Sequence, residues 1–144
     1  MEWAALITWV LTAGGGFVLL SIWLARGGMR QQHDGGNQIR PPLVLSHFLL
    51  AATGLVIWII YLAADKHALA WIAFVILAVV TVLGWTMFAI WVRRRQGRPD
   101  AATTSAPGMP AEQHFPVSVV TLHGILAVTT VVLVLLSALE VGGS

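Results

Sequence analysis

The chain has 144 residues, of which 58% are hydrophobic and only 10% charged, and its net charge is +2. So few polar residues cannot cover the surface of a water-soluble globular protein, and this composition excludes that class. There are no cysteines, which excludes disulfides, iron–sulfur clusters, thiolate catalysis and covalent haem attachment. Any metal chemistry therefore has to rest on histidine.

Four apolar segments set the predicted fold. They occupy residues 3–25, 43–64, 68–92 and 115–139, and each exceeds the ~20 residues that an α-helix needs to cross the bilayer core. Strands of a membrane barrel would be shorter and would alternate polar with apolar residues. We therefore expect an all-α integral membrane protein, a four-helix up-down-up-down bundle that forms one transmembrane domain over residues 1–144.

The basic residues predict the orientation of this bundle. Seven of the eight Lys and Arg residues lie in the connecting loops 26–42 and 93–114. By the positive-inside rule, both loops should be cytoplasmic and both termini outside a cell (inner or plasma) membrane. The first cation, Arg26, follows the first apolar segment, so we expect that segment to be retained and not cleaved as a signal peptide. The basic composition reflects topology, and no nucleic-acid partner is expected.

The sequence contains an internal repeat. The first and third segments match at an offset of 68, which pairs Trp3 with Trp71, Gly16 with Gly84 and Arg26 with Arg94. The second and fourth match at an offset of 76, which pairs His47 with His123 and Ala51 with Ala127. This pattern predicts a duplicated helical hairpin, with halves related by an axis along the membrane normal. Coincidence within a limited apolar alphabet is the alternative.

Two histidines lie inside the predicted membrane segments. His47 and His123 follow Pro42 and Pro116 by five and seven residues, which places both ~7–11 Å from the cytoplasmic ends of their helices. In an up-down-up-down bundle these two helices stand diagonally, with axes about 13 Å apart. Imidazoles that reach inward across this gap leave room for one metal, and a flat macrocycle can pass between the other two helices. The pair therefore suits bis-His ligation of one non-covalent haem b.

Small and basic residues surround the predicted site. Residues four and seven beyond each histidine share its helical face and leave a slot; they are Ala51, Gly54, Ala127 and Thr130. Gly16 and Gly84 on the flanking helices could admit the porphyrin, although close helix packing is an equal explanation for the Gly14–Gly16 run. Arg26, Arg40 and Arg94 could neutralise the haem propionates, whereas anchoring to anionic lipid is the simpler role for an arginine cluster.

This combination resembles the b-type membrane cytochromes, in particular the cytochrome b561-like architecture. The resemblance implies that His47 and His123 are axial ligands and that Gly16 and Gly84 pack against the ring. It implies a one-electron carrier that exchanges electrons with a quinone, a redox protein or a respiratory complex, in the bilayer and as a monomer or homo-oligomer. Two-haem members carry a second His pair near the opposite face, where this chain has only His67 in a predicted loop, so the resemblance does not extend to transmembrane electron transfer by this chain alone.

Three other interpretations stay open. The histidines could form a structural hydrogen-bonded pair in a non-redox accessory or assembly subunit of a larger membrane complex. They could instead form a non-haem metal site or the proton-linked site of a small transporter. No Asp, Glu, Asn or Cys accompanies the pair within the membrane segments, which weakens both of these last two readings. No motif specifies a substrate, so an enzyme is less strongly indicated than an electron carrier.

Overall fold

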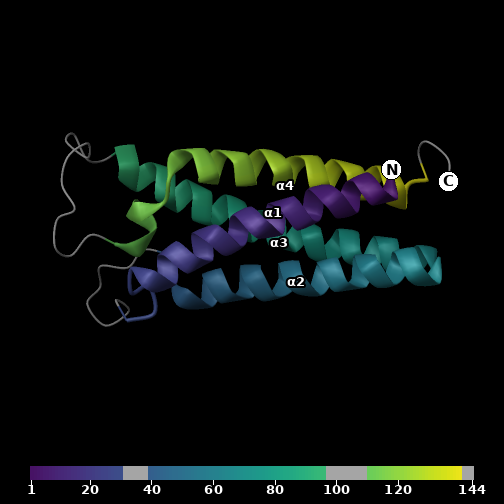
Figure 1. Cartoon of the computed structure of the whole chain (residues 1–144), viewed down its shortest axis with the longest axis horizontal. Coiled ribbons are helices and arrows are strands. Elements are labelled where there is room, and N and C mark those ends of the chain that lie inside the picture. Colours follow the sequence, from purple (N-terminus) through teal and green to yellow (C-terminus); the bar gives the residue numbers. More distant parts are fainter. Residues whose placement is uncertain (31–38, 97–109, 141–144) are drawn as a thin grey trace.

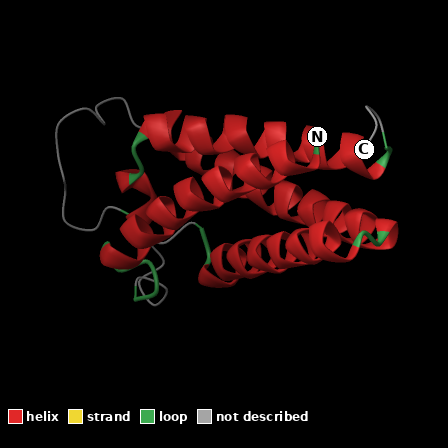
Figure 2. Ribbon diagram, turned by 45° about the vertical axis from the view of Figure 1, so that its right-hand side comes forward, coloured by secondary structure: helices red, strands yellow, loops and turns green. Residues whose placement is uncertain are grey.

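The structure is a computed structural model that describes residues 1–30, 39–96 and 110–140. It contains the helices α1 (Glu2–Ala25), α2 (Pro41–Ala64), α3 (His67–Gln96) and α4 (Val117–Ala138), and the short 3-10 helix η2 (Ala111–His114). Each of the four α-helices is long and apolar enough to cross a membrane. Figure 2 shows helices joined by loops, with no strand in the part of the chain described. The all-α four-helix prediction is confirmed.

The helix ends differ slightly from the sequence-based expectation. The helix α2 begins with Pro41 and Pro42, because the first turn of a helix does not need their missing N–H groups. The helix α3 starts at His67, which was expected in a loop, and continues through Arg93–Arg95 to Gln96; positive side chains favour a helix C-terminus. The expected connector 93–114 thus contains the last turn of α3 and all of η2, while residues 31–38 and 97–109 lie outside the described chain.

The four helices form a closed ring of neighbours. The helix α1 packs chiefly against α4, and α2 against α3, while the pairs α1–α2 and α3–α4 complete the ring. Consequently α2 and α4 face each other across the diagonal. Figure 1 shows Met1, the α2–α3 turn and the end of α4 at one end, here called the terminal end. Arg26, Arg40 and Arg93–Arg95 lie at the other, the arginine end.

Residues paired by the repeat have matching environments. At the offset of 68, Ala5 and Ala73 are both fully buried, and the side chains of Trp23 and Trp91 are both buried. At the offset of 76, Trp58 and Val134 are buried, and Tyr61 pairs with buried Ser137. Matched burial at matched positions is what a duplicated helical hairpin requires, because each half presents the same face to the interior.

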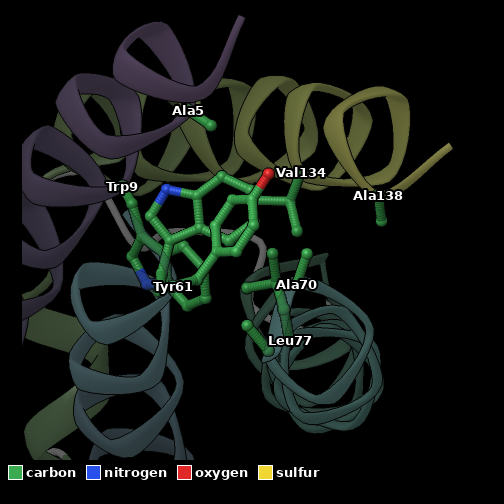
Figure 3. Packing of buried hydrophobic residues seen from close by; sticks show 9 residues of the cluster. Ala5, Trp9, Tyr61, Ala70, Leu77, Val134 and Ala138 are labelled. Carbon is green, nitrogen blue, oxygen red and sulfur yellow. The ribbon is translucent and has the colours of Figure 1, made fainter. Parts of the chain in front are cut away.

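The packed hydrophobic core occupies the terminal half of the bundle (Figure 3). Trp9 lies 6.3 Å from Trp58, and Trp58 lies 4.9 Å from Tyr61, measured between ring centroids. The Tyr61 hydroxyl donates a hydrogen bond to the Glu2 carboxylate. Small and branched residues fill the space around the rings, namely Ala5, Ala70, Ala73, Leu77, Val134 and Ala138. This core holds the four helices together at the terminal end.

A second buried layer closes the arginine end. Trp23 and Trp91 are its largest members. Gly28 lies directly against the Trp23 indole, and the Arg95 guanidinium sits 5.1 Å from the centre of the Trp91 ring. The helix η2 packs against α1 and α3 at this end.

Between these two layers the bundle is loosely packed. None of the residues 10–22, 42–53, 81–90 and 117–129 is fully buried, although these segments supply inward-facing positions on all four helices. Native interiors are normally close-packed. The loosely packed layer therefore has inner surfaces that the protein's own side chains do not fully cover.

Candidate functional site

His47 and His123 meet inside the loosely packed layer. Their rings come from the diagonally opposed helices α2 and α4, and their centroids lie 6.4 Å apart with an angle of 62° between the ring planes. Both side chains are half-buried. The two imidazoles thus lie at the same depth and close enough to act on one bound group.

Each ring is held by a backbone carbonyl on a neighbouring helix. His47 Nδ1 lies 3.0 Å from the Val80 oxygen, and His123 Nδ1 lies 2.9 Å from the Thr12 oxygen. A carbonyl oxygen only accepts hydrogen bonds, so Nδ1 is the donor in both cases. In a neutral ring this leaves the lone pair on Nε2, and neither Nε2 has a hydrogen bond within the described residues. Metal-binding histidines commonly show this arrangement, in which the second nitrogen donates to a carbonyl.

The two hydrogen bonds follow the repeat. Thr12 and Val80 are separated by the offset of 68, and the histidines by the offset of 76. Each half of the duplicated hairpin therefore supplies a histidine from its second helix and a carbonyl from its first, and the donor of one half bonds to the acceptor of the other. Both bonds cross between the halves.

Gly16 and Gly84 make room for the imidazoles. A β-carbon on Gly16 would lie 3.0 Å from His123 Cε1, and one on Gly84 would lie 3.1 Å from His47 Cε1. These separations are tighter than ordinary van der Waals contact, so a side chain at either position would press on the ring. The sequence suggested that these glycines face a porphyrin; in the structure their nearest neighbours are the histidine rings.

The other predicted lining residues divide into two groups. Ala51 and Ala127 are half-buried and belong to the loosely packed layer. Gly54 is buried, with Trp9 Cζ2 3.0 Å from where its β-carbon would be. Thr130 is buried and its Oγ1 lies 3.2 Å from Thr12 Oγ1. Gly54 and Thr130 therefore mark the boundary with the terminal core.

The three predicted arginines lie at the arginine end. Arg26 occupies the C-cap position of α1, Arg40 occupies the N-cap position of α2 without a side-chain capping hydrogen bond, and Arg94 is in the last turn of α3. All three are exposed. His67 lies at the opposite end, where its Nδ1 is 3.3 Å from Glu140 and its Nε2 accepts a hydrogen bond from Trp71.

The separation of the two rings can be compared with that of two imidazoles bound to one metal ion. Metal–nitrogen bonds of about 2 Å on opposite sides of one ion put the two ring centres roughly 6 Å apart, and the observed separation is 6.4 Å. No group of three or more His, Cys, Asp or Glu side chains able to hold a metal occurs in the described parts of the chain. A metal held by the two imidazoles would take its remaining ligands from a bound group, and a macrocycle is one that could supply them.

Sequence reasoning did not identify the carbonyls of Thr12 and Val80. It placed Trp23 and Trp91 near the inner membrane interface as an aromatic belt, but it did not predict that both are buried in one layer. Trp23 and Trp91 are paired at the offset of 68 and each follows a site glycine by seven residues, so the spacing could have indicated this layer. Comparisons with protein-family models, with curated proteins and with solved structures found no match to this chain.

Proposed function

We propose that this protein is a membrane-embedded b-type cytochrome that binds one non-covalent haem b through His47 and His123. The observation that carries the proposal is the symmetric pair of imidazoles, each held through Nδ1 by a carbonyl while its Nε2 is left to ligate. The ring separation, which matches that of two imidazoles bound to one metal ion, also supports the proposal. So does the resemblance to the cytochrome b561-like architecture.

The loosely packed layer supplies the space for the macrocycle. Gly16 and Gly84 on α1 and α3, with Ala51 and Ala127 on α2 and α4, leave little side-chain volume at this depth. Gly54 and Thr130 border it toward the terminal core. Haem binding would therefore fill an interior that the protein leaves incompletely packed, and burial of an apolar ring would stabilise the bundle.

Bound haem supplies one-electron exchange at iron, and two histidine ligands leave no position for dioxygen. The chain's own residues fix the imidazole orientation through the carbonyls of Val80 and Thr12. This arrangement suits an electron carrier better than an enzyme with a substrate of its own.

Charge distribution suggests the orientation and the partners. Arginines concentrate at one end of the bundle, so this end would face the cytoplasm in a cell membrane and both termini would lie outside. The haem would then lie in the cytoplasmic half, where a membrane quinone, a redox protein or a respiratory complex could exchange electrons with it, as could a second copy of the chain.

A non-redox accessory subunit is the second candidate. The hydrogen bonds from His47 and His123 to carbonyls on α3 and α1 would by themselves bridge helices, which is a common structural role of membrane histidines. A transporter is less well supported, because no carboxylate lies in the described part of the loosely packed layer.

Absorption spectra of the detergent-purified protein distinguish these candidates. Oxidised and dithionite-reduced wild type should show the sharp bands of a low-spin b haem, and His47→Ala or His123→Ala should lose them. His47→Asn and His123→Asn are the matched controls, because an Asn amide can still donate to the carbonyl but cannot replace Nε2. We expect the Asn variants to fold and to lack the low-spin spectrum. A colourless wild type that takes up no added hemin would exclude the cytochrome.

The orientation can be tested separately. Because the chain has no cysteine, Asp65→Cys and Gln96→Cys each create a single thiol, at the terminal and arginine ends respectively. A membrane-impermeant thiol reagent applied to intact cells should label Asp65→Cys only. Labelling of Gln96→Cys alone would reverse the proposed topology.

A further inference from the structure

The layer at the arginine end contains two indole N–H groups without an acceptor. Trp23 and Trp91 are 0% and 6% exposed, and neither Nε1 has a hydrogen-bond partner within the described residues. Buried polar groups in native proteins are nearly always hydrogen-bonded. The two donors lie at positions related by the repeat, and the buried Glu112 carboxylate of η2 at the same end accepts from neither of them, so both can bond to an acceptor on a bound group.

Each tryptophan follows a site glycine on its own helix. Trp23 follows Gly16, and Trp91 follows Gly84, by seven residues, which is two helical turns, or about 10 Å, on the same face. Side chains on a helix lean toward its N-terminus, and in α1 and α3 the N-terminal direction leads from the tryptophan to the histidine layer. Gly28 and Arg95 cover the two indoles. The two donors are thus enclosed about two helical turns from the site glycines, on the arginine side.

We propose that Trp23 and Trp91 donate hydrogen bonds to the two propionate carboxylates of the haem, so that the propionate edge faces the arginine end. This inference rests on the proposed function. Carboxylates are strong acceptors, and hydrogen bonds to a charged group are stronger than those between neutral groups. The two tryptophans lie on the diagonally opposed helices α1 and α3. A haem carries both propionates on one edge, so one donor on each side of that edge can serve one propionate each.

The arginines would have a supporting role in this arrangement. Arg26 and Arg94 each lie three residues beyond a tryptophan, one turn closer to the end of the bundle. Both are exposed, so water screens their charge from the interior. The indoles fix the carboxylates in place, and the guanidiniums lower the electrostatic cost of placing two negative charges at this end.

Trp58 provides a matched control. It is also fully buried with an unpartnered Nε1 in the described structure, but it lies in the terminal core, and its repeat position holds Val134, which has no donor. A single indole in that layer cannot serve two carboxylates symmetrically. Trp58→Phe therefore removes an equivalent donor from the opposite side of the histidine layer.

The test compares two porphyrins that differ in their carboxylates. The full chain, purified without haem, is titrated with hemin and with iron etioporphyrin, which has only alkyl substituents. We expect Trp23→Phe and Trp91→Phe each to weaken hemin binding on the order of tenfold, while etioporphyrin binding changes little. The low-spin spectrum should persist in both variants, because His47 and His123 are intact. Trp58→Phe should not affect one porphyrin more than the other.

The remaining outcomes separate the two proposals. Equal weakening for both porphyrins would make the tryptophans packing residues and overturn the inference, while the cytochrome would stand. Selective loss of hemin affinity in Trp58→Phe would indicate that the propionates face the terminal end, and this result would also overturn the inference. If neither porphyrin gives a low-spin spectrum in the wild type, the proposed function itself is wrong. If Trp23→Phe does not fold, Trp91→Phe decides the question alone.

Discussion

The two halves of the duplicated hairpin build the same histidine environment with different surroundings. His47 bonds to the Val80 carbonyl beside Gly84, and His123 bonds to the Thr12 carbonyl beside Gly16, with nearly equal distances. One layer closer to the terminal end, the halves diverge. Thr12 and Thr130 form a hydroxyl pair, whereas the space at Gly54 is filled by Trp9.

The features that agree are those that position an imidazole, and those that differ are contacts between helices that do not involve the histidines. A carbonyl can be supplied by any residue, so threonine in one half and valine in the other serve the histidines equally. A glycine beside each ring cannot be replaced in this way. Substitutions at repeat-related positions should therefore have equal effects in the two halves at the histidine layer and unequal effects one layer away.

The largest effect is expected at the two site glycines. Gly16→Val and Gly84→Val would each push side-chain atoms into an imidazole, and overpacking of this kind costs about 1–3 kcal/mol. Both variants should lower the thermal unfolding temperature by similar amounts and perturb any low-spin spectrum. Gly14→Val is the control, because nothing lies within 4 Å of its β-carbon position. A destabilised Gly84→Val beside an unaffected Gly16→Val would show that the halves are not equivalent.

A smaller and asymmetric effect is expected at the terminal end. Tyr61 and Ser137 are repeat partners, but the Tyr61 hydroxyl bonds to Glu2, while Ser137 Oγ is buried with no partner in the described structure. Tyr61→Phe should therefore cost about 0.5–1.5 kcal/mol, and Ser137→Ala should cost nothing or slightly stabilise the bundle. Thermal unfolding in detergent, followed by circular dichroism, measures both. Equal destabilisation would contradict the assigned contacts.

The smallest effect is expected for the hydroxyl pair. Interhelical hydrogen bonds in membrane proteins contribute about 0.6 kcal/mol on average. Because the Thr12 and Thr130 hydroxyls also bond to the Thr8 and Leu126 carbonyls of their own helices, Thr12→Val and Thr130→Val should each destabilise by no more than this order. Combined in a double-mutant cycle, the two changes should not add. Thr129→Val is the matched control, since its exposed hydroxyl bonds only to the Ile125 carbonyl of its own helix. Additive losses would mean that the two hydroxyls do not interact.

The sequence predicted the fold because hydrophobic length and charge position depend only on local composition. Four apolar segments required four helices, and the offsets of the repeat placed His47 and His123 at one depth. The neighbours of each residue were harder to predict. Gly54 shares a helical face with His47, yet Trp9, 45 residues earlier in the sequence, fills its space. Contacts of this kind depend on the rotation and crossing of helices, which spacing within one helix does not determine.

The proton positions on the histidines were also outside the reach of sequence reasoning. The acceptors are the backbone carbonyls of Thr12 and Val80, and a backbone acceptor leaves no trace in the identity of its residue. The repeat could have shown that any carbonyl used by one histidine would have a counterpart for the other. Only the structure shows which nitrogen is occupied.

The central claim is that one haem is held between His47 and His123. The most direct measurement is a hemin titration of the purified wild type, His47→Asn and His123→Asn proteins, followed by electron paramagnetic resonance of the ferric state. We predict that the wild type saturates at one hemin per chain with a low-spin signal, and that each Asn variant loses this signal while keeping its helical content. Low-spin haem that persists in either Asn variant, or no saturable uptake by the wild type, would contradict the account.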